Sequence, residues 1–328
     1  MSARLVLAID GGNSKTDVAL VAEDGSLLAY ARGPQSSPHH LGLEGCLAVL
    51  QQLVDEVGLD GSGAEIAQVL LAGIDFPVEE ERLHAAVVAR GWSARVRVGN
   101  DTFAVLRAGT ESGWGVAITC GAGINCVGVA PDGRQVRFPA LGEITGDWGG
   151  GYDVGLSALW HAARSEDGRG PRSALEELVP AFFGYRTPLE LAYAIHVGEL
   201  PMRRVVELAP LVLESDDPVA VQIVERLVAE IVSLARAAAT RLGFVAGGVE
   251  VVLGGGLMRR ADDTLLGLIE HGLGEIGVGL VLRRMSEPPV VGAALLGLDE
   301  LGADAEAHDR LRTELRAAVD RLETTGVG

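Results

Sequence analysis

Hydrophobic and polar residues follow one another at the start of the chain in a pattern typical of strands joined by a glycine loop. Residues 4–10 are almost continuously apolar, which predicts a strand buried on both faces. The loop 11–16 follows, and residues 17–21 then alternate polar and apolar before a turn at Asp24-Gly25. The pattern predicts strand, loop, strand, turn and strand, with no helix directly after the loop.

Residues 115–137 repeat this plan. The apolar segment 115–120 precedes a second glycine loop, 121–125, and Pro131-Asp132-Gly133 closes the next turn. Later segments also correspond: strand 66–72, helix 79–90 and strand 95–99 in the first half, and strand 249–253, helix 261–272 and strand 278–282 in the second. Repetition on this scale predicts two homologous domains, each a mixed sheet flanked by helices.

The domain limits follow from the repeat. We expect an N-terminal domain at 1–110 and a C-terminal domain at 111–328, the second carrying a mainly helical insertion at about 153–243. An apolar helix at about 290–300 can pack back on the N-terminal domain. The charged, amphipathic tail from Ala305 is expected to be a solvated surface helix.

Composition excludes several classes of partner. The 328 residues include 45 acidic and 27 basic side chains, for a net charge of −18, so neither nucleic acid nor an anionic membrane is an expected partner. No apolar run reaches membrane-spanning length. Three cysteines, Cys46, Cys120 and Cys126, are too few for a disulfide framework and indicate a reducing, cytoplasmic compartment.

The first glycine loop has the composition of a phosphate-binding loop. Its glycines allow close approach to a ligand, Ser14 and Thr16 carry hydroxyls, and Lys15 is the only lysine of the chain. Asp10, at the strand end, is the expected Mg²⁺ ligand. A glycine loop alone can equally be a turn, but the hairpin context favours an actin-like phosphate loop. The predicted nucleotide-binding residues here are Gly11, Gly12, Asn13, Ser14, Lys15 and Thr16.

Two further glycine turns complete the predicted ATP site. Gly121, Ala122 and Gly123 of the second loop are expected to hold the polyphosphate from the other domain. Gly254-Gly255-Gly256 with Met258, between a strand and a helix, suits the adenosine end of the nucleotide. The alternative for this last segment is a plain strand-to-helix turn.

Carboxylates at strand ends are the catalytic candidates, because open sheets bind ligands beyond the carboxyl ends of their strands. Asp75, Asp101 and Asp147 stand at such positions. Asp101 can equally be the N-cap of the helix that runs through Val105 and Leu106, so its role stays open at this point.

Taken together, these segments resemble a known family. The loop from Asp10 to Thr16, Gly99-Asn100-Asp101, Gly121 to Asn125, Gly146-Asp147-Trp148-Gly149 and Gly254-Gly255-Gly256 are similar to motifs of N-acetylglucosamine kinases in the BadF/BadG/BcrA/BcrD-type ATPase family, part of the actin, hexokinase and heat-shock-chaperone superfamily. The resemblance extends over about residues 4–298. It implies an α/β fold of two ribonuclease-H-like domains with mixed five-stranded sheets, and ATP, Mg²⁺ and a sugar between them.

The resemblance also implies roles for single residues. Asp101 corresponds to the catalytic base and Ser14 to a phosphate-binding threonine, while Asn125, Asp147 and Asp75 correspond to residues that face the sugar. The full set of expected substrate residues is Asp75, Asn100, Asp101, Ile124, Asn125 and Asp147.

The chain departs from the family pattern mainly at sugar-contact positions. Ala122 replaces a threonine, Ile124 a small hydroxyl residue, and Trp148 the glutamate of a Gly-Asp-Glu-Gly motif. Leu141 stands where the family has tryptophan, and Ser36-Ser37-Pro38 where an asparagine is expected. Phosphate and base positions therefore match better than sugar-specific ones.

The expected activity is phosphorylation of a hexosamine by ATP, with N-acetylglucosamine and its C6 hydroxyl first, and glucosamine or N-acetylmuramic acid as alternatives. A homodimer that binds a small sugar is the expected assembly. A second hypothesis is an ATP-driven activator of an iron–sulfur dehydratase, which needs two cysteines per subunit around a shared cluster. Cys120 has a suitable position for this role, whereas Cys126 is expected to point along a strand. A third is a non-catalytic sensor on the same fold.

Overall fold

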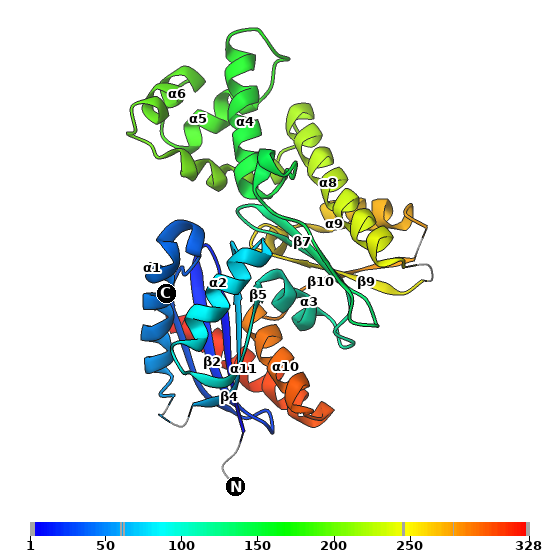
Figure 1. Cartoon of the computed structure of the whole chain (residues 1–328). Coiled ribbons are helices and arrows are strands. Elements are labelled where there is room, and N and C mark those ends of the chain that lie inside the picture. The colour runs from blue at the N-terminus through cyan, green and yellow to red at the C-terminus, as the bar shows by residue number, and fades with distance from the viewer. Residues whose placement is uncertain (1–3, 60, 62, 245–246, 278, 326–328) are drawn as a thin grey trace. The chain divides into compact units, whose positions relative to one another are not determined.

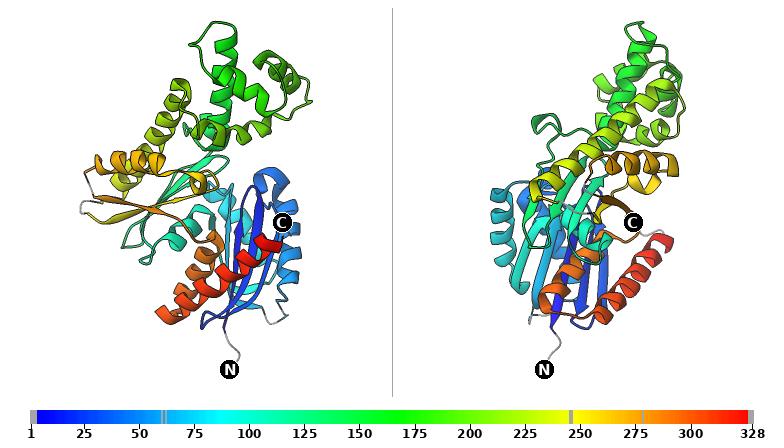
Figure 2. Two further views of the ribbon diagram at one scale, coloured as in Figure 1. Left: turned by 180° about the vertical axis from the view of Figure 1, so that it is seen from behind. Right: turned by 90° about the vertical axis from the view of Figure 1, so that its right-hand side faces the viewer.

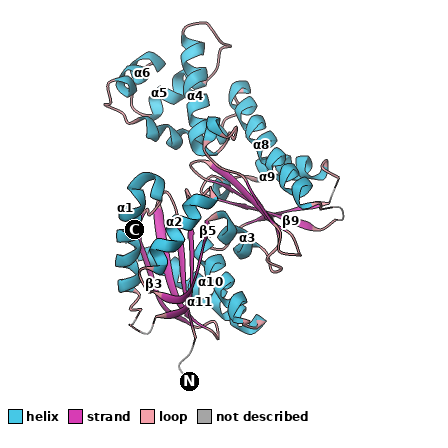
Figure 3. Ribbon diagram, viewed as in Figure 1, coloured by secondary structure: helices cyan, strands magenta, loops and turns pink. Residues whose placement is uncertain are grey.

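The computed structural model describes residues 4–59, 61, 63–244, 247–277 and 279–325. Over these residues the chain forms two five-stranded sheets with helices on their faces (Figures 1 and 3). The predicted α/β class with two mixed sheets is confirmed. Contacts divide the described chain into two compact units, one within 1–117, 127–139 and 283–328 and the other within 118–126 and 140–282. The domain limits 1–110 and 111–328 stay a prediction.

The first sheet lies within one unit and has the order β3-β2-β1-β4-β5. Its strands are β1 (Leu5–Gly11), β2 (Lys15–Ala22), β3 (Leu27–Pro34), β4 (Ala64–Leu71) and β5 (Ser93–Asn100). β2 runs antiparallel to β1, whereas β4 and β5 run parallel to it. The register pairs Gly11 with Leu71 and Leu71 with Asn100, so β1, β4 and β5 end level at one edge.

Helices cover both faces of this sheet (Figure 2). They are α1 (Pro38–Glu56), α2 (Pro77–Val88), α3 (Thr102–Gly109), α10 (Pro289–Leu301) and α11 (Ala305–Thr325). Alternate side chains of β1 enter two cores: Leu7 and Ile9 pack with α1 and α2, and Val6 and Ala8 with α10 and α11. Burial on both faces is the reason that this strand is almost continuously apolar.

The prediction for the C-terminal tail was wrong in one respect. α11 is amphipathic, as expected, but its apolar face is not solvated: Leu311 and Leu315 are fully buried and Val319 nearly so, in the core that β1 shares with α10. Charged residues stand between these apolar positions, but the apolar residues recur at helical spacing and together cover one face of the first sheet.

The second sheet has the order β10-β9-β6-β7-β8. Its strands are β6 (Gly115–Cys120), β7 (Ile124–Val129), β8 (Gln135–Arg137), β9 (Val249–Gly254) and β10 (Leu280–Arg284). Residue 278, where a strand was predicted to begin, lies outside the described residues.

The segment between β8 and β9 is mainly helical, with α4 (Gly150–Glu166), α5 (Leu175–Phe182), α6 (Pro188–His196), α7 (Ala209–Leu213) and α8 (Pro218–Leu242). Its assignment as an insertion stays a prediction. α9 (Asp263–Gly274) follows β9, and short 3-10 turns lie at Gly142–Ile144, Met202–Leu208 and Met258–Arg260. Along the described chain, no helix is both long and apolar enough to cross a membrane.

The duplicated plan is visible in the turns themselves. The Gly25 N–H donates to the Ala22 carbonyl at 2.9 Å, and the Gly133 N–H donates to the Ala130 carbonyl at 2.9 Å. Both glycines adopt a φ of +84°, which an L-residue with a side chain rarely adopts. The similar phrases around these turns in the sequence therefore correspond to the same local structure in each half.

Candidate active site

The first glycine loop is a tight hairpin turn between β1 and β2. The Gly12 N–H donates to the Lys15 carbonyl at 2.8 Å, so Asn13 and Ser14 form the exposed tip. β2 begins at Lys15, and the prediction that no helix follows the loop is confirmed. The tip offers the Ser14 hydroxyl and main-chain groups to a ligand.

Other members of this loop point inward. The Thr16 hydroxyl is fully buried, 2.7 Å from the Pro34 carbonyl and 2.8 Å from Ser36 Oγ. A Cβ atom on Gly11 would lie 2.3 Å from Ser36 Oγ. Gly11 and Thr16 therefore fix the segment after β3 against the hairpin, and the structure does not bring them to the exposed tip.

Lys15 belongs to a charge network that the sequence did not reveal. Its Nζ lies 3.3 Å from a carboxylate oxygen of Asp17, which is fully buried and also accepts hydrogen bonds from the Tyr30 hydroxyl and the Arg32 guanidinium, both at 2.6 Å. Asp17 is the cross-strand partner of Asp10. Counting residues outward from the turn would have paired the two aspartates, because hairpin register is symmetric about its turn.

Asp10, the predicted Mg²⁺ ligand, is a nearly buried carboxylate. Only 9% of its surface is exposed, and burial, followed by the charges of Asp17 and Asp101, raises its pKa well above the usual range. A Mg²⁺ ion would favour the ionised carboxylate, and such ions take one or two carboxylates together with phosphate oxygens and water. Within the described ranges no three acidic, histidine or cysteine side chains form a metal cluster, so nucleotide oxygens would have to complete the coordination.

Asp75, Asn100 and Asp101 meet at the carboxyl edge of the first sheet. Asn100, 2% exposed, donates from Nδ2 to Asp75 Oδ1 at 3.2 Å and to the Ile74 carbonyl at 3.3 Å, while its Oδ1 accepts the Thr102 N–H at 2.9 Å. Asp75 is also buried. The level ends of β4 and β5 bring these predicted residues together.

Asp101 occupies the N-cap position of α3, but its side chain makes no capping hydrogen bond. The carboxylate is half-buried, and burial, followed by the charge of Asp75, raises its pKa to about 7. A carboxylate with this pKa is suited to accept a proton near neutral pH. Asp101 therefore takes part in the start of α3 through its carbonyl, which accepts the N–H groups of Ala104 and Val105, and its side chain makes no capping hydrogen bond.

Glu79 supports this edge and was not identified from the sequence. Its Oε2 accepts the N–H groups of Asp75 and Phe76, at 2.8 and 2.9 Å, and its Oε1 lies 3.4 Å from His39 Nε2. Glu79 is the third residue of α2, but the N-cap residue is Phe76 and not the serine or threonine of a capping-box motif, so the sequence pattern did not reveal this role.

The second glycine loop is packed against the start of α4. The carbonyls of Gly121 and Ala122 accept the N–H groups of Gly151 and Tyr152, both at 2.8 Å. Gly123 is different: a Cβ atom there would meet no atom within 4 Å. Open space therefore remains beside Gly123, as a main-chain phosphate contact would require.

The third glycine turn lies beside this loop. The Leu257 N–H donates to the Cys120 carbonyl at 3.1 Å, and a Cβ atom on Gly255 would lie 2.3 Å from that carbonyl oxygen. Two predicted nucleotide segments, 121–123 and 254–256, thus stand next to each other at the ends of β6 and β9. Met258, by contrast, is buried with 1% exposure.

Two of the predicted sugar residues of the second half, Asp147 and Asn125, have side-chain oxygens that accept local hydrogen bonds. Asp147, half-buried, accepts the Gly142 N–H at 3.0 Å and a hydrogen bond from the Thr145 hydroxyl. Asn125 Oδ1 accepts the Cys126 N–H at 2.7 Å. Ile124 is buried, 3.0 Å from where a Cβ atom of Gly149 would lie.

Two residues that were not predicted hold the Asp147 loop. Asp153 accepts the Gly149 N–H at 2.8 Å, and burial, with Asp147 nearby, raises the pKa of Asp153. The Arg226 guanidinium lies over the Trp148 ring, 4.0 Å from its centroid. Trp148, the departure from the family motif, is therefore covered by a cation from α8.

The cysteines are buried and none of the three is in a disulfide. Burial raises the pKa of Cys120 to about 12 and that of Cys126 further. Cluster ligation needs thiolates that can reach the metal. The hypothesis of an electron-transferring activator thus has no support from these side chains.

Comparison with known proteins assigns the class. The chain belongs to the BadF/BadG/BcrA/BcrD ATPase family, which it matches over residues 7–297. It is 29% identical to the N-acetylmuramic acid/N-acetylglucosamine kinase of Clostridium acetobutylicum over 214 residues, 64% of this chain and 70% of that protein. It is 28% identical to the N-acetyl-D-glucosamine kinase of Dictyostelium discoideum over 192 residues, 55% of this chain and 60% of the relative.

A solved structure gives the same indication for the whole fold. A candidate N-acetylglucosamine kinase from Chromobacterium violaceum is similar with a TM-score of 0.68 and 25% identity, over 90% of this chain and 99% of the other. The family resemblance noted from the motifs is therefore confirmed.

Proposed function

We propose that this protein is an ATP-dependent kinase that phosphorylates the C6 hydroxyl of an N-acetylated hexosamine, with N-acetylglucosamine as the first candidate. The observation that carries the proposal is Asp101: a half-buried carboxylate without a capping bond, next to Asp75 and Asn100, with a pKa raised to about 7. The names of the relatives in Clostridium and Dictyostelium support the same substrate class.

Each group has a defined task in this proposal. Asp101 accepts the hydroxyl proton while the sugar oxygen forms a bond to the γ-phosphorus and the bond to the β,γ-bridging oxygen breaks, releasing ADP. Asp75 and Asn100 hold the sugar, and Ser14 with the main chain of Gly12, Gly121 and Gly123 holds the phosphates. Mg²⁺, held by Asp10, would neutralise charge on the transferred group.

The proposal extends to the setting of the enzyme. We infer a cytoplasmic location, which agrees with three buried cysteines that form no disulfide, and a homodimer as the assembly. Sedimentation of the purified chain tests the assembly directly.

A coupled assay of ADP release tests the activity. The panel contains neutral hexoses, glucosamine, N-acetylglucosamine and N-acetylmuramic acid, each with ATP and with or without Mg²⁺. We expect magnesium-dependent turnover with an N-acetylated hexosamine and a product whose phosphate is on C6 by NMR. Turnover with neutral hexoses only would overturn the substrate class, and ADP release that needs no sugar would overturn the kinase assignment.

A further inference from the structure

Asp101 stands at one end of a very short helix, and a group of charged residues holds the other end. α3 comprises eight residues, and Arg107 lies six positions after Asp101, about 9 Å along the axis at 1.5 Å per residue. A rigid element of this length transmits a tilt at one end to the other. The contacts at Arg107 therefore bear on the position of the Asp101 carboxylate.

α10 determines where α3 lies. A Cβ atom on Gly292 of α10 would lie 1.9 Å from the Ala104 carbonyl oxygen and 2.9 Å from the Ala108 nitrogen. The two helices thus approach until their main chains touch, which only glycine permits. α10 thus packs against the middle of α3, and a charged contact between the two helices lies further toward the C-terminal end of α3.

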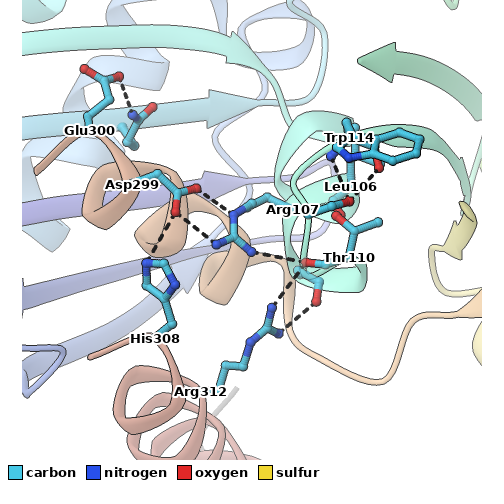
Figure 4. A network of polar contacts seen from close by, with 11 residues as sticks. Leu106, Arg107, Thr110, Trp114, Asp299, Glu300, His308 and Arg312 are labelled. Atoms are coloured by element: carbon cyan, nitrogen blue, oxygen red, sulfur yellow. Dashed lines mark hydrogen bonds and ion pairs between the residues drawn. The ribbon is translucent and has the colours of Figure 1, made fainter. Parts of the chain in front are cut away.

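The charged contact is a two-pronged ion pair between Arg107 and Asp299. Arg107 Nε and Nη2 donate to the two carboxylate oxygens at 2.6 and 3.0 Å, and Nη1 donates to the Thr110 carbonyl at 3.1 Å (Figure 4). The Arg107 side chain is only 6% exposed. A fork-to-carboxylate pair fixes orientation as well as distance, and a buried guanidinium depends on its counter-ion.

The carbonyl end of α3 carries further donors from α11. Arg312 donates to the Ala108 carbonyl at 2.9 Å and to the Thr110 carbonyl at 3.4 Å. Cations at a helix C-terminus complement the helix dipole. His308 Nε2 lies 3.3 Å from Asp299, but burial, with Arg107 and Arg312 nearby, lowers the pKa of His308. Arg107 is therefore the cation that Asp299 neutralises.

We propose that Asp299, acting through Arg107, is a positioning residue for Asp101: the pair holds α3 so that the carboxylate meets the sugar hydroxyl. This inference rests on the proposed function, because it assigns Asp101 the role of the base. Neither residue of the pair touches the substrate in this proposal. Their contribution is to keep the base within the narrow range of distance and angle that proton transfer requires.

The adjacent residue of α10 supplies a matched control. Glu300 also forms an ion pair, accepting from Arg97 Nε at 2.9 Å and from Gln68 Nε2 at 3.1 Å. These partners lie on β4 and β5 and not on α3. Glu300→Gln removes one charge from the same helix, next to Asp299 in the sequence, and leaves the contacts of α3 with Asp299 and Arg312 in place.

The experiment compares Asp299→Asn, Arg312→Gln and Glu300→Gln in the full chain. We expect Asp299→Asn to lower kcat by about 10- to 100-fold with the KM for sugar changed less than about threefold, since a misplacement of about 1 Å suffices for such losses. Arg312→Gln, which removes donors but leaves Arg107 paired, should change kcat in the same direction by a smaller factor. Glu300→Gln should leave kcat unchanged.

Hydrogen exchange gives a readout that does not depend on turnover. Peptides that cover residues 100–109 should exchange faster in Asp299→Asn, while peptides from α1 and α2 exchange as in the wild type. If Asp299→Asn does not fold, Arg312→Gln carries the same two measurements.

The outcomes separate the two proposals. Faster exchange confined to α3 with no sugar phosphorylation by the wild type supports the anchoring and overturns the proposed function. Unchanged kcat in Asp299→Asn, or an equal fall of kcat in Glu300→Gln, overturns the positioning role and leaves the kinase proposal intact.

Discussion

The two halves of the chain repeat one strand plan, yet they build unlike edges at the ends of their sheets. The edge of the first sheet is made of charged and polar side chains: Asp10, Asp75, Asn100 and Asp101 lie there, three of them almost fully buried. The corresponding edge of the second sheet is made of main chain, with glycine turns 121–123 and 254–256 in close contact.

This difference shows that the two halves of a duplicated fold can take different chemical tasks, one proton transfer and the other anion binding. Burial raises the pKa values of Asp10 and Asp101, and a carboxylate with a pKa of about 7, such as Asp101, can exchange protons near neutral pH. Glycine turns lack side chains and offer N–H groups to an anion. In the proposed kinase, the first half supplies the proton chemistry and the second half supplies much of the phosphate binding.

Asp101→Asn should give the largest effect, because it removes the proton acceptor from the charged edge and leaves the glycine edge intact. We expect kcat to fall by about 100-fold or more, as measured by ADP release, while ATP binding by calorimetry is unchanged. The substitution should also raise Tm at about pH 8. Burial raises the pKa of this carboxyl in the folded state, so its ionisation costs stability as the pH rises through about 7.

Loss of ATP binding together with kcat would show that the two edges do not divide the work in this way. Retained sugar phosphorylation would remove Asp101 from the role of base.

The pH dependence of kcat should show the second-largest effect. With a pKa of about 7, Asp101 is the active, deprotonated base above that pH, and kcat should fall about tenfold per pH unit below it. The measurement is kcat at saturating ATP and sugar from about pH 5.5 to about pH 8.5. The KM for ATP is the control, because it reports on the glycine turns of the second sheet and not on Asp101. A flat profile between about pH 6 and about pH 8 would contradict the raised pKa.

A pair of glycine substitutions tests the second edge and should give the smallest effect. A Cβ atom on Gly150 would lie 2.4 Å from the Gly123 carbonyl oxygen, and its φ is +77°. Gly150→Ala should cost at least about 1–2 kcal/mol in urea unfolding and weaken ATP binding.

Gly123→Ala is the matched control for stability, since a Cβ atom there meets nothing within 4 Å and the φ is not positive. Unequal stability with equal ATP affinity in the two variants would mean that the packing of this loop against α4 does not serve the nucleotide.

Local patterns were sufficient for most of the fold and for one part of the site. The apolar run before Gly11 and the alternation after Lys15 predicted the hairpin, because both depend on residues near in sequence. The expectation that ligands bind beyond the carboxyl ends of strands placed Asp75 and Asp101 at one edge. It was sufficient because β4 and β5 are parallel and end level with each other.

What the sequence did not predict depends on partners far along the chain. The inward direction of Thr16 is determined by Pro34 and Ser36, and the buried face of α11 by a core built from the first strands. The pairing of Arg107 with Asp299 joins residues 192 positions apart. No periodicity or spacing in a single sequence encodes such contacts.

The position of α11 has a consequence for how the chain is synthesised. β1 emerges from the ribosome long before Leu311, Leu315 and Val319, which cover one face of its core. Until α11 has been translated, that apolar face of the nascent sheet is exposed to water and to other chains. Productive folding around β1 therefore requires translation of α11, and chains released before α11 are the ones expected to aggregate.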